Sequence, residues 1–185
     1  MLNIRVAQVN DIPEIANIHE IGWRNTYSFM PEAVLLNRDK NFRMQQWQNW
    51  FNEDRASQDE ALYVFEENGK TVGFCMCKPN DDDMLIGARG ELHALYVLPD
   101  VRTFGISFLA INTLSKFLLE RNLAPLCCWA FQKNKIWRWY ERLGFKRIIA
   151  RNRRINNIEI PEYGLVHFEP NKLIDYTGQK LALAA

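Results

Sequence analysis

The sequence predicts a mixed α/β domain, because short strand-like segments are interspersed with longer helix-like ones. Three observations lead to this prediction. The chain has 185 residues, 48% of them hydrophobic, which suffices for one domain with a core. Apolar residues alternate along several short segments, as they do in strands. In longer segments they recur every three or four positions, as on one face of a helix. The expected order of elements is β-α-α-β-β-β-α-β-α-β-β.

The first third of the chain predicts one strand and two helical regions. Residues 2–9 alternate in the manner of a strand. Asp11 is expected to cap the following helix, with Glu14 as its capping-box partner. A second helical region is expected over 31–51, after an aromatic segment that interrupts the first helical period.

The middle of the chain predicts a hairpin and a buried strand. Two strands, about 61–65 and 71–77, flank Asn68-Gly69, a dipeptide that favours a tight turn because both residues tolerate positive φ. The strand at 91–98 has apolar residues on both faces and is expected to be buried on both sides.

The last part of the chain predicts two helices alternating with strands, followed by a loose tail. The tail, 171–185, is weakly patterned and is expected to be loosely ordered, so a single domain is expected over 1–170. The expected elements are a helix from about 104, a strand at 125–131, a helix at 133–142, and strands at 145–150 and 159–169.

Charge, hydrophobicity and cysteine spacing argue against several classes of protein. The net charge of +1 argues against a nucleic-acid binder. No apolar run approaches the ~18 residues of a membrane span, and the N-terminus lacks the pattern of a signal peptide, so a cytoplasmic protein without membrane contact is expected. The histidines are scattered and the cysteines lack zinc-ligand spacing, so no metal site is expected. Reduced core thiols are expected at Cys75, Cys77, Cys127 and Cys128.

An anion-binding loop is predicted after the strand at 91–98. The strand is followed by Pro99, a short loop and then a helix. The first amides of that helix and its dipole favour a negative charge. The pattern Arg102-x-x-Gly105-x-Ser107 resembles the pyrophosphate loop of the GNAT superfamily of acyl-CoA-dependent N-acyltransferases. Ser107 stands where that family usually has Gly or Ala, and is small enough for a phosphate to approach the backbone.

A second segment strengthens the resemblance. Trp139–Phe145 reads WYERLGF and is similar to the GNAT signature Phe-Tyr-Glu-x-Leu-Gly-Phe, in the order that the family has. A family Asn usually lies seven residues before the Tyr, whereas Asn134 lies six before Tyr140. The resemblance covers about residues 2–168. It implies a GNAT-like single domain with a mixed sheet and splayed central strands.

The resemblance also implies an activity. It predicts an N-acetyltransferase that moves an acetyl group from acetyl-CoA to a primary amine, of a small molecule or a peptide, by direct transfer through a tetrahedral intermediate. The expected cofactor-binding residues are Leu95, Tyr96 and Val97 for the pantetheine arm, Arg102, Thr103, Phe104, Gly105, Ile106 and Ser107 for the pyrophosphate, and Asn134.

Three residues are candidates for proton transfer. Tyr140 resembles the family tyrosine that protonates the leaving thiolate. Glu91 and His93 share one face of their strand, and either is a candidate base, directly or through water. Glu91 is expected to lie nearer to solvent. The family sometimes uses no side-chain base, so that alternative stays open.

Other interpretations remain open. Trp23, Tyr27 and Phe29 either wall the acceptor pocket or pin helices onto the sheet. The chain could instead be a GNAT-like module that binds acyl-CoA for regulation or interaction, with little turnover. A homodimer is compatible with either function. One basic cluster is read as a solvated face, with attraction of CoA phosphates or an acidic substrate as the alternative: Lys146, Arg147, Arg151, Arg153 and Arg154.

Overall fold

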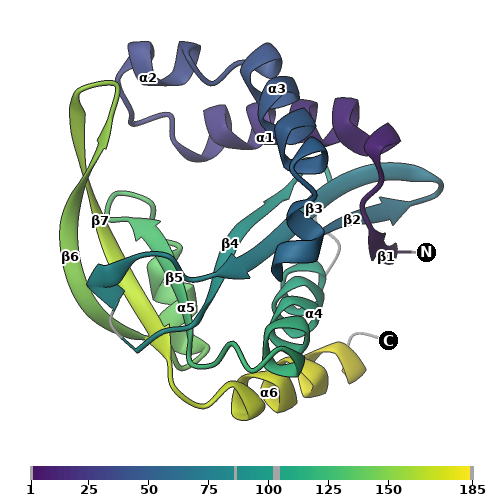
Figure 1. Ribbon diagram of the computed structural model, residues 1–185, viewed down its shortest axis with the longest axis vertical. Coiled ribbons are helices and arrows are strands. Elements are labelled where there is room, and N and C mark those ends of the chain that lie inside the picture. Colours follow the sequence, from purple (N-terminus) through teal and green to yellow (C-terminus); the bar gives the residue numbers. More distant parts are fainter. Residues whose placement is uncertain (1, 86, 102–104, 184–185) are drawn as a thin grey trace. The chain divides into compact units, whose positions relative to one another are not determined.

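The computed structural model describes residues 2–85, 87–101 and 105–183 (Figure 1). They form two compact units, one from the described residues of 1–76 and 94–103, the other from those of 77–93 and 104–185. The predicted mixed α/β fold is confirmed. In hydrogen-bonding order the strands of the described residues run β1-β2-β3-β4-β5-β7-β6.

The first unit combines a helical layer with one part of the sheet. Strand β1 pairs antiparallel with β2, and the predicted turn at Asn68-Gly69 has φ values of 52° and 76°. Helix α1 packs against α3, and Ile15, Trp47 and Phe74 are buried in the core between these elements. The elements are β1 (Leu2–Val6), η1 (Val9–Asp11), α1 (Ile12–Thr26), α2 (Glu32–Leu36), α3 (Lys40–Asn52), η2 (Arg55–Gln58), β2 (Ala61–Glu67), and parts of β3 (Lys70–Pro79) and β4 (Gly90–Val97).

The predicted cap of α1 is wrong. Asp11 makes no side-chain cap to that helix. Its carboxylate instead receives hydrogen bonds from Arg5, at 2.7 and 2.8 Å, and from the backbone amide of Gln8 at 2.7 Å. Hydrogen bonding to Arg5 is the main cause that holds the pKa of Asp11 below its ordinary value. Asp11 therefore binds the guanidinium of Arg5 with both carboxylate oxygens instead of accepting a hydrogen bond from an amide of α1.

The predicted helical region at 31–51 is two helices rather than one. Helix α2 ends at Leu36, and α3 begins after Asp39, whose carboxylate accepts a 2.8 Å hydrogen bond from the Phe42 amide. Aspartate is a preferred residue at the N-cap of a helix, so Asp39 indicated that a second helix begins within the predicted region.

The second unit holds the remaining strands and three helices of the described residues. Strands β6 and β7 form a hairpin through Asn156 and Asn157, which both have positive φ. Strand β5 pairs antiparallel with β7. The further elements are η3 (Asp83–Leu85), α4 (Ile106–Glu120), β5 (Leu126–Phe131), α5 (Trp137–Arg142), β6 (Lys146–Ile155), β7 (Ile158–His167) and α6 (Pro170–Ala182).

The parallel pairing of β4 with β5 is short. It joins Gly90 to Leu126 and Glu91 to Cys127. Within the second unit, Leu92 and His93 lie beyond this register. Two strands that splay apart must stop pairing early, and the short register of β4 with β5 meets this requirement.

The tail was expected to be loose, and this is wrong. Residues 170–182 form α6, which lies beside α4 (Figure 1). The side-chain amide of Asn112 on α4 donates 2.8 Å hydrogen bonds to the Ile174 carbonyl and to the Thr177 hydroxyl. Asn112 and Thr177 are both buried, so α6 is anchored through a polar contact inside the helix pair.

Four buried cysteines lie outside any disulfide bond, as expected for core thiols: Cys75, Cys77, Cys127 and Cys128. In the part of the chain that the structure describes, none of the helices has the length and apolar character needed to cross a membrane. The same residues contain no group of three or more His, Cys, Asp or Glu side chains arranged to hold a metal ion.

Candidate functional site

The two candidate bases are in direct contact in the second unit. Glu91 and His93 lie two residues apart on β4, so their side chains leave the same face of the strand. His93 Nδ1 lies 2.6 Å from Glu91 Oε1. Sequence alternation therefore correctly predicted that these residues share a face.

The expected exposure of the pair is reversed. The Glu91 side chain is only 7% exposed, whereas that of His93 is 35% exposed. Glu91 lies within the β4–β5 register, opposite Cys127, and His93 lies beyond it. The carboxylate is buried and the imidazole is not, so the prediction that Glu91 is nearer to solvent is wrong.

Two further charged residues complete a cluster, the Glu91 cluster, made of Glu91, His93, Lys78 and Asp81. Lys78 Nζ lies 3.7 Å from Glu91 Oε2 and donates to both carboxylate oxygens of Asp81 at 2.8 Å. Sequence reasoning missed both residues. One signal was available in the sequence. Lys78 directly follows the apolar run of β3, and an ammonium group covered at such a place needs a carboxylate partner.

The Glu91 cluster keeps its central carboxylate ionised. Burial acts to raise the pKa of Glu91, but the hydrogen bond to His93 and the charges of His93 and Lys78 outweigh burial, so the pKa lies below its ordinary value. An ionised carboxylate can only accept hydrogen bonds. The 2.6 Å contact therefore requires a proton on His93 Nδ1, which leaves Nε2 as the proton-accepting nitrogen of the neutral ring.

The expected glycine lies at the start of α4. Gly105 precedes the helix with φ of 98°, a left-handed conformation that glycine adopts without strain. Having no side chain, Gly105 cannot cap the first amides of α4. The amides of Ile106 and Ser107 thus have no partner within the helix and suit a phosphate oxygen. The expected residues Arg102, Thr103 and Phe104 lie outside the described residues.

Leu95, Tyr96 and Val97 belong to the first unit and are half-buried. The burial expected on both faces is therefore incomplete in this half of β4. The Tyr96 ring packs against His19 and Phe74, with centroid distances of 4.6 and 5.5 Å. A Cβ on Gly22 would lie 2.5 Å from the Tyr96 ring, so a glycine on α1 is needed for this contact.

Tyr140 lies on α5 in the second unit and is half-buried. Its ring makes edge contacts with Trp139 and Phe145, at centroid distances of 5.2 and 5.4 Å. Asn134 precedes the helix, and its side-chain oxygen accepts a 3.2 Å hydrogen bond from the Ile136 amide. This turn occupies the residues expected to begin the helix, so α5 starts at Trp137 instead.

The three predicted acceptor aromatics form one cluster in the first unit. Trp23 and Tyr27 pack edge to face at 4.6 Å, and Tyr27 and Phe29 at 6.0 Å. Trp23 is buried, whereas Tyr27 and Phe29 are half-buried. The buried ring serves packing, and the other two leave aromatic surface that a ligand can contact.

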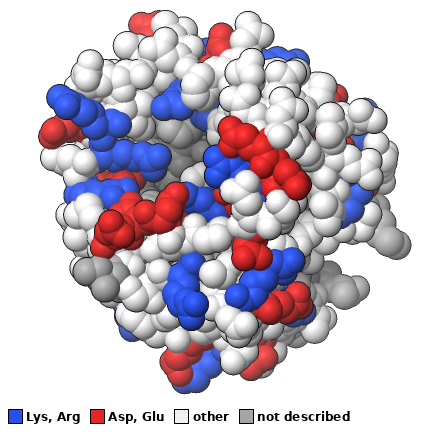
Figure 2. Space-filling view, in the orientation of Figure 1, with Lys and Arg blue, Asp and Glu red and all other residues white. Residues whose placement is uncertain are grey.

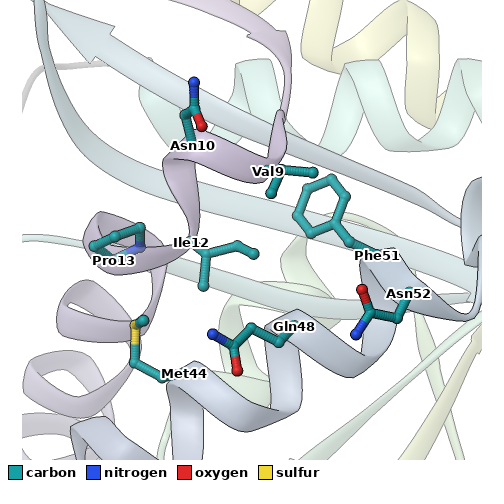
Figure 3. A pocket seen from close by; sticks show the side chains of 8 residues that line it. All are labelled: Val9, Asn10, Ile12, Pro13, Met44, Gln48, Phe51 and Asn52. Carbon is teal, nitrogen blue, oxygen red and sulfur yellow. The ribbon is translucent and has the colours of Figure 1, made fainter.

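A hollow of about 590 Å³ lies elsewhere in the first unit (Figure 3). It contains none of the predicted site residues. It is bordered by η1, the start of α1 and α3, through Val9, Asn10, Ile12, Pro13, Met44, Gln48, Phe51 and Asn52.

The basic cluster on β6 is largely matched by acidic partners in its own unit. Arg147 contacts Glu141 at 2.6 Å, and Arg151 donates to Glu162 at 2.8 Å and to Asp82 at 2.6 Å. Basic and acidic side chains also alternate over short distances on the face shown in Figure 2. These contacts weaken the alternative in which the cluster attracts phosphates.

Comparison with known proteins identifies the family. The model of the Acetyltransferase (GNAT) family matches residues 16–145. The chain belongs to the GNAT acetyltransferase family. A GNAT relative, the uncharacterized N-acetyltransferase YuaI of Bacillus subtilis, is 25% identical over 168 residues, which are 89% of this chain and 92% of YuaI.

Solved GNAT structures share the fold. The PaiA N-acetyltransferase of Thermoplasma acidophilum, crystallised with coenzyme A, has a TM-score of 0.67 at 16% identity, covering 88% of this chain and 98% of its own. YncA of Salmonella typhimurium, a putative acetyltransferase solved with acetyl-CoA, has a TM-score of 0.65 at 17% identity, covering 91% and 94%. The predicted GNAT resemblance is confirmed, and the protein is an acyltransferase.

Proposed function

We propose that the protein transfers an acetyl group from acetyl-CoA to a primary amine, with His93 as the general base. The observation that carries this proposal is the contact between His93 and the buried Glu91 in a member of the GNAT family. When bound, acetyl-CoA supplies the activated acetyl group.

His93 and Glu91 take different parts in this proposal. His93 is the exposed member of the pair and has Nε2 available to take the amine proton. Glu91 holds the ring through Nδ1 and places a negative charge beside it, which favours the protonated ring as it forms. Lys78 and Asp81 in turn keep Glu91 in place.

The chain offers a fitting place for the cofactor. Gly105 has no side chain to cap α4, so the amides at Gly105, Ile106 and Ser107 would hold the pyrophosphate, together with Arg102, Thr103 and Phe104. The backbone of Leu95, Tyr96 and Val97 would hold the pantetheine arm in the manner of an added strand. Asn134 would contribute through its remaining side-chain N–H groups.

Tyr140 is proposed as the acid that protonates the leaving thiolate. A phenol of ordinary pKa, about 10, is close in acidity to a thiol and can therefore exchange a proton with it readily. The edge contacts with Trp139 and Phe145 restrict the ring. The half-buried Tyr27 and Phe29, with Trp23, are proposed to form the acceptor wall.

The proposed function is tested by incubating the protein with acetyl-CoA and a panel of primary amines. Thiol release and the mass of the acetylated amine are the two readouts. His93→Ala should lower kcat roughly 10²- to 10⁴-fold, the usual contribution of a positioned base. Lys116→Ala, which changes an exposed residue of α4, is the control.

Two results would contradict the proposal at different levels. Full turnover by His93→Ala removes the base assignment and leaves acetyl transfer intact. Failure of the wild-type protein to acetylate any amine of a broad panel contradicts the function itself.

A further inference from the structure

Arg43 is a buried cation that forms no ion pair with a carboxylate of the described residues. It lies on α3 in the first unit and is only 3% exposed. Its Nη1 donates to Gln46 Oε1 at 2.8 Å. Its Nε and Nη2 are shielded from solvent, and no acceptor among residues 2–85, 87–101 and 105–183 receives a hydrogen bond from either. A buried donor in this condition is unfavourable unless water or a ligand satisfies it.

The two unmatched nitrogens are adjacent on the guanidinium. The N–H groups of Nε and Nη2 point outward in parallel from one edge of the planar group. Their spacing matches the two oxygens of a carboxylate, which can accept both hydrogen bonds at once. Among the described residues, the side-chain hydrogen bond from Arg43 to Gln46 uses Nη1 and leaves this edge unmatched.

The surroundings of Arg43 favour the arrival of a negative charge. Burial is the largest cause that lowers the pKa of Arg43, to about 10, so the group remains protonated at neutral pH. Arg38 also acts against this charge, and both guanidinium groups lie over the Phe42 ring, at 4.5 Å for Arg38 and 5.5 Å for Arg43. The nearby Glu20 offers little compensation because it pairs with Arg24 at 3.1 Å.

Arg43 also adjoins the predicted acceptor wall. Its guanidinium lies 5.0 Å from the centroid of the Trp23 ring, the first member of the aromatic cluster with Tyr27 and Phe29. Phe42, whose ring centroid lies 5.5 Å from the guanidinium, is 40% exposed.

We propose that Arg43 binds a carboxylate of the acceptor, so that the substrate is an amine that also carries a carboxylate, as an amino acid does. This inference rests on the proposed acetyl transfer. A carboxylate fits better than a phosphate because this aromatic setting removes water, and dehydration is costlier for a dianion than for a monoanion. Displacement of the exposed Phe42 ring gives the ligand its route.

The test compares amino acids with their own carboxamides, which retain the amine and lose only the carboxylate. Glycine, methionine and phenylalanine form three such pairs. Rates are compared per concentration of unprotonated amine, because the carboxamide lowers the pKa of the amine. The wild-type kcat/KM should be at least about tenfold higher for the acids, as expected for charged hydrogen bonds.

Variants assign the preference to Arg43. In Arg43→Met the ratio of acid to carboxamide should fall to near one. Arg43→Lys should keep only part of the ratio, since an ammonium group lacks the paired N–H edge. Arg55→Met removes a partly exposed arginine of η2 in the same unit, which pairs with Glu53 rather than Glu20, and should keep the full ratio.

Thermal unfolding supplies a readout without turnover. Arg43→Met without ligand should unfold at a higher temperature than the wild type, because it removes a buried unmatched charge. The amino acids should raise the wild-type midpoint, and inorganic phosphate should raise it less.

The outcomes separate this inference from the proposed function. Equal acetylation of acids and carboxamides by the wild type overturns the role of Arg43 and leaves acetyl transfer standing. Stabilisation by amino acids without acetylation of any amine supports Arg43 and contradicts the function. A lower midpoint in Arg43→Met with no stabilisation of the wild type by amino acids shows a structural arginine and overturns the inference.

Discussion

At the scale of single residues, Glu91 shows how a buried acid is kept charged. Its oxygens meet His93 on the same strand and Lys78 on the preceding one, and Lys78 is shared with Asp81. Burial by itself acts to raise the pKa of Glu91, and the contacts with His93 and Lys78 lower it. The ionised state of Glu91 therefore depends on the cluster as a whole.

This arrangement predicts a pH dependence of stability. The pKa of folded Glu91 lies below its ordinary value of 4.5, so its contribution is fully present above that pH and is lost as the pH falls through the folded pKa. Glu91→Gln should lower the unfolding free energy at pH 7 by about 1–3 kcal/mol and flatten its dependence below pH ~4.5. Denaturant unfolding across this range is the measurement.

Glu14→Gln changes an exposed carboxylate on α1 and should follow the wild-type curve. A Glu91→Gln profile parallel to that of the wild type below pH ~4.5 would show that Glu91 does not contribute to the dependence.

Contacts between site residues could be predicted from the sequence where the two residues are close along the chain. The shared face of Glu91 and His93 follows from strand alternation alone. Lys78 and Asp81 could not be assigned to them, because that contact depends on how β3 and β4 align. The spacing of Arg43 and Trp47 places both on one helix face, yet an arginine on that face gave no indication that its Nε and Nη2 would stay unmatched.

At the scale of elements, the turn into α4 makes a prediction about coenzyme A. Gly105→Ala forces an L side chain into a conformation with φ of 98° and should cost about 1–2 kcal/mol of stability. Relief of that strain would rotate the first amides of α4, so the Kd for coenzyme A should rise about tenfold or more. Calorimetric titration with coenzyme A measures it.

Gly87 provides a matched control for this variant. It has φ of 90°, and a Cβ there would meet nothing within 4 Å. Gly87→Ala should therefore carry similar strain while the affinity for coenzyme A remains unchanged. Equal affinities of both variants would show that the turn at Gly105 does not take part in binding.

The anchor of α6 makes a second prediction at this scale. Asn112→Ala removes both hydrogen bonds to α6 and should destabilise the protein by about 1–3 kcal/mol, because the contact is buried. Hydrogen exchange of the α6 amides should accelerate. Asn152→Ala is the control, since its hydrogen bond to Glu159 is exposed. Unchanged exchange in α6 would mean that Asn112 does not anchor it.

Elements were predictable where local signals were strong. The hairpin at Asn68-Gly69 formed as expected because positive φ is an intrinsic preference of that dipeptide. The division between α2 and α3 was missed although Asp39 marked it. Helix α6 was missed because it is held by packing on α4, including the hydrogen bonds from Asn112, which is distant in the sequence.

At the scale of the whole molecule, ligand binding should be visible as stability. A cofactor that binds only the folded chain raises the free energy of unfolding, by about 2.7 kcal/mol at a concentration of 100 Kd. Coenzyme A and acetyl-CoA should both raise the unfolding midpoint, as thermal scanning can record, while adenosine alone should do so less. No shift at millimolar coenzyme A would contradict the cofactor assignment.

The buried thiols have a practical consequence for following turnover. Burial is the main cause that raises the pKa values of Cys127 and Cys128, and Cys75 and Cys77 are buried as well. Thiol reagents react with exposed thiolates, so the folded chain should consume almost none. A colorimetric disulfide reagent would then count each turnover directly from the free coenzyme A that it produces. The same reagent would detect unfolding as four further equivalents per chain.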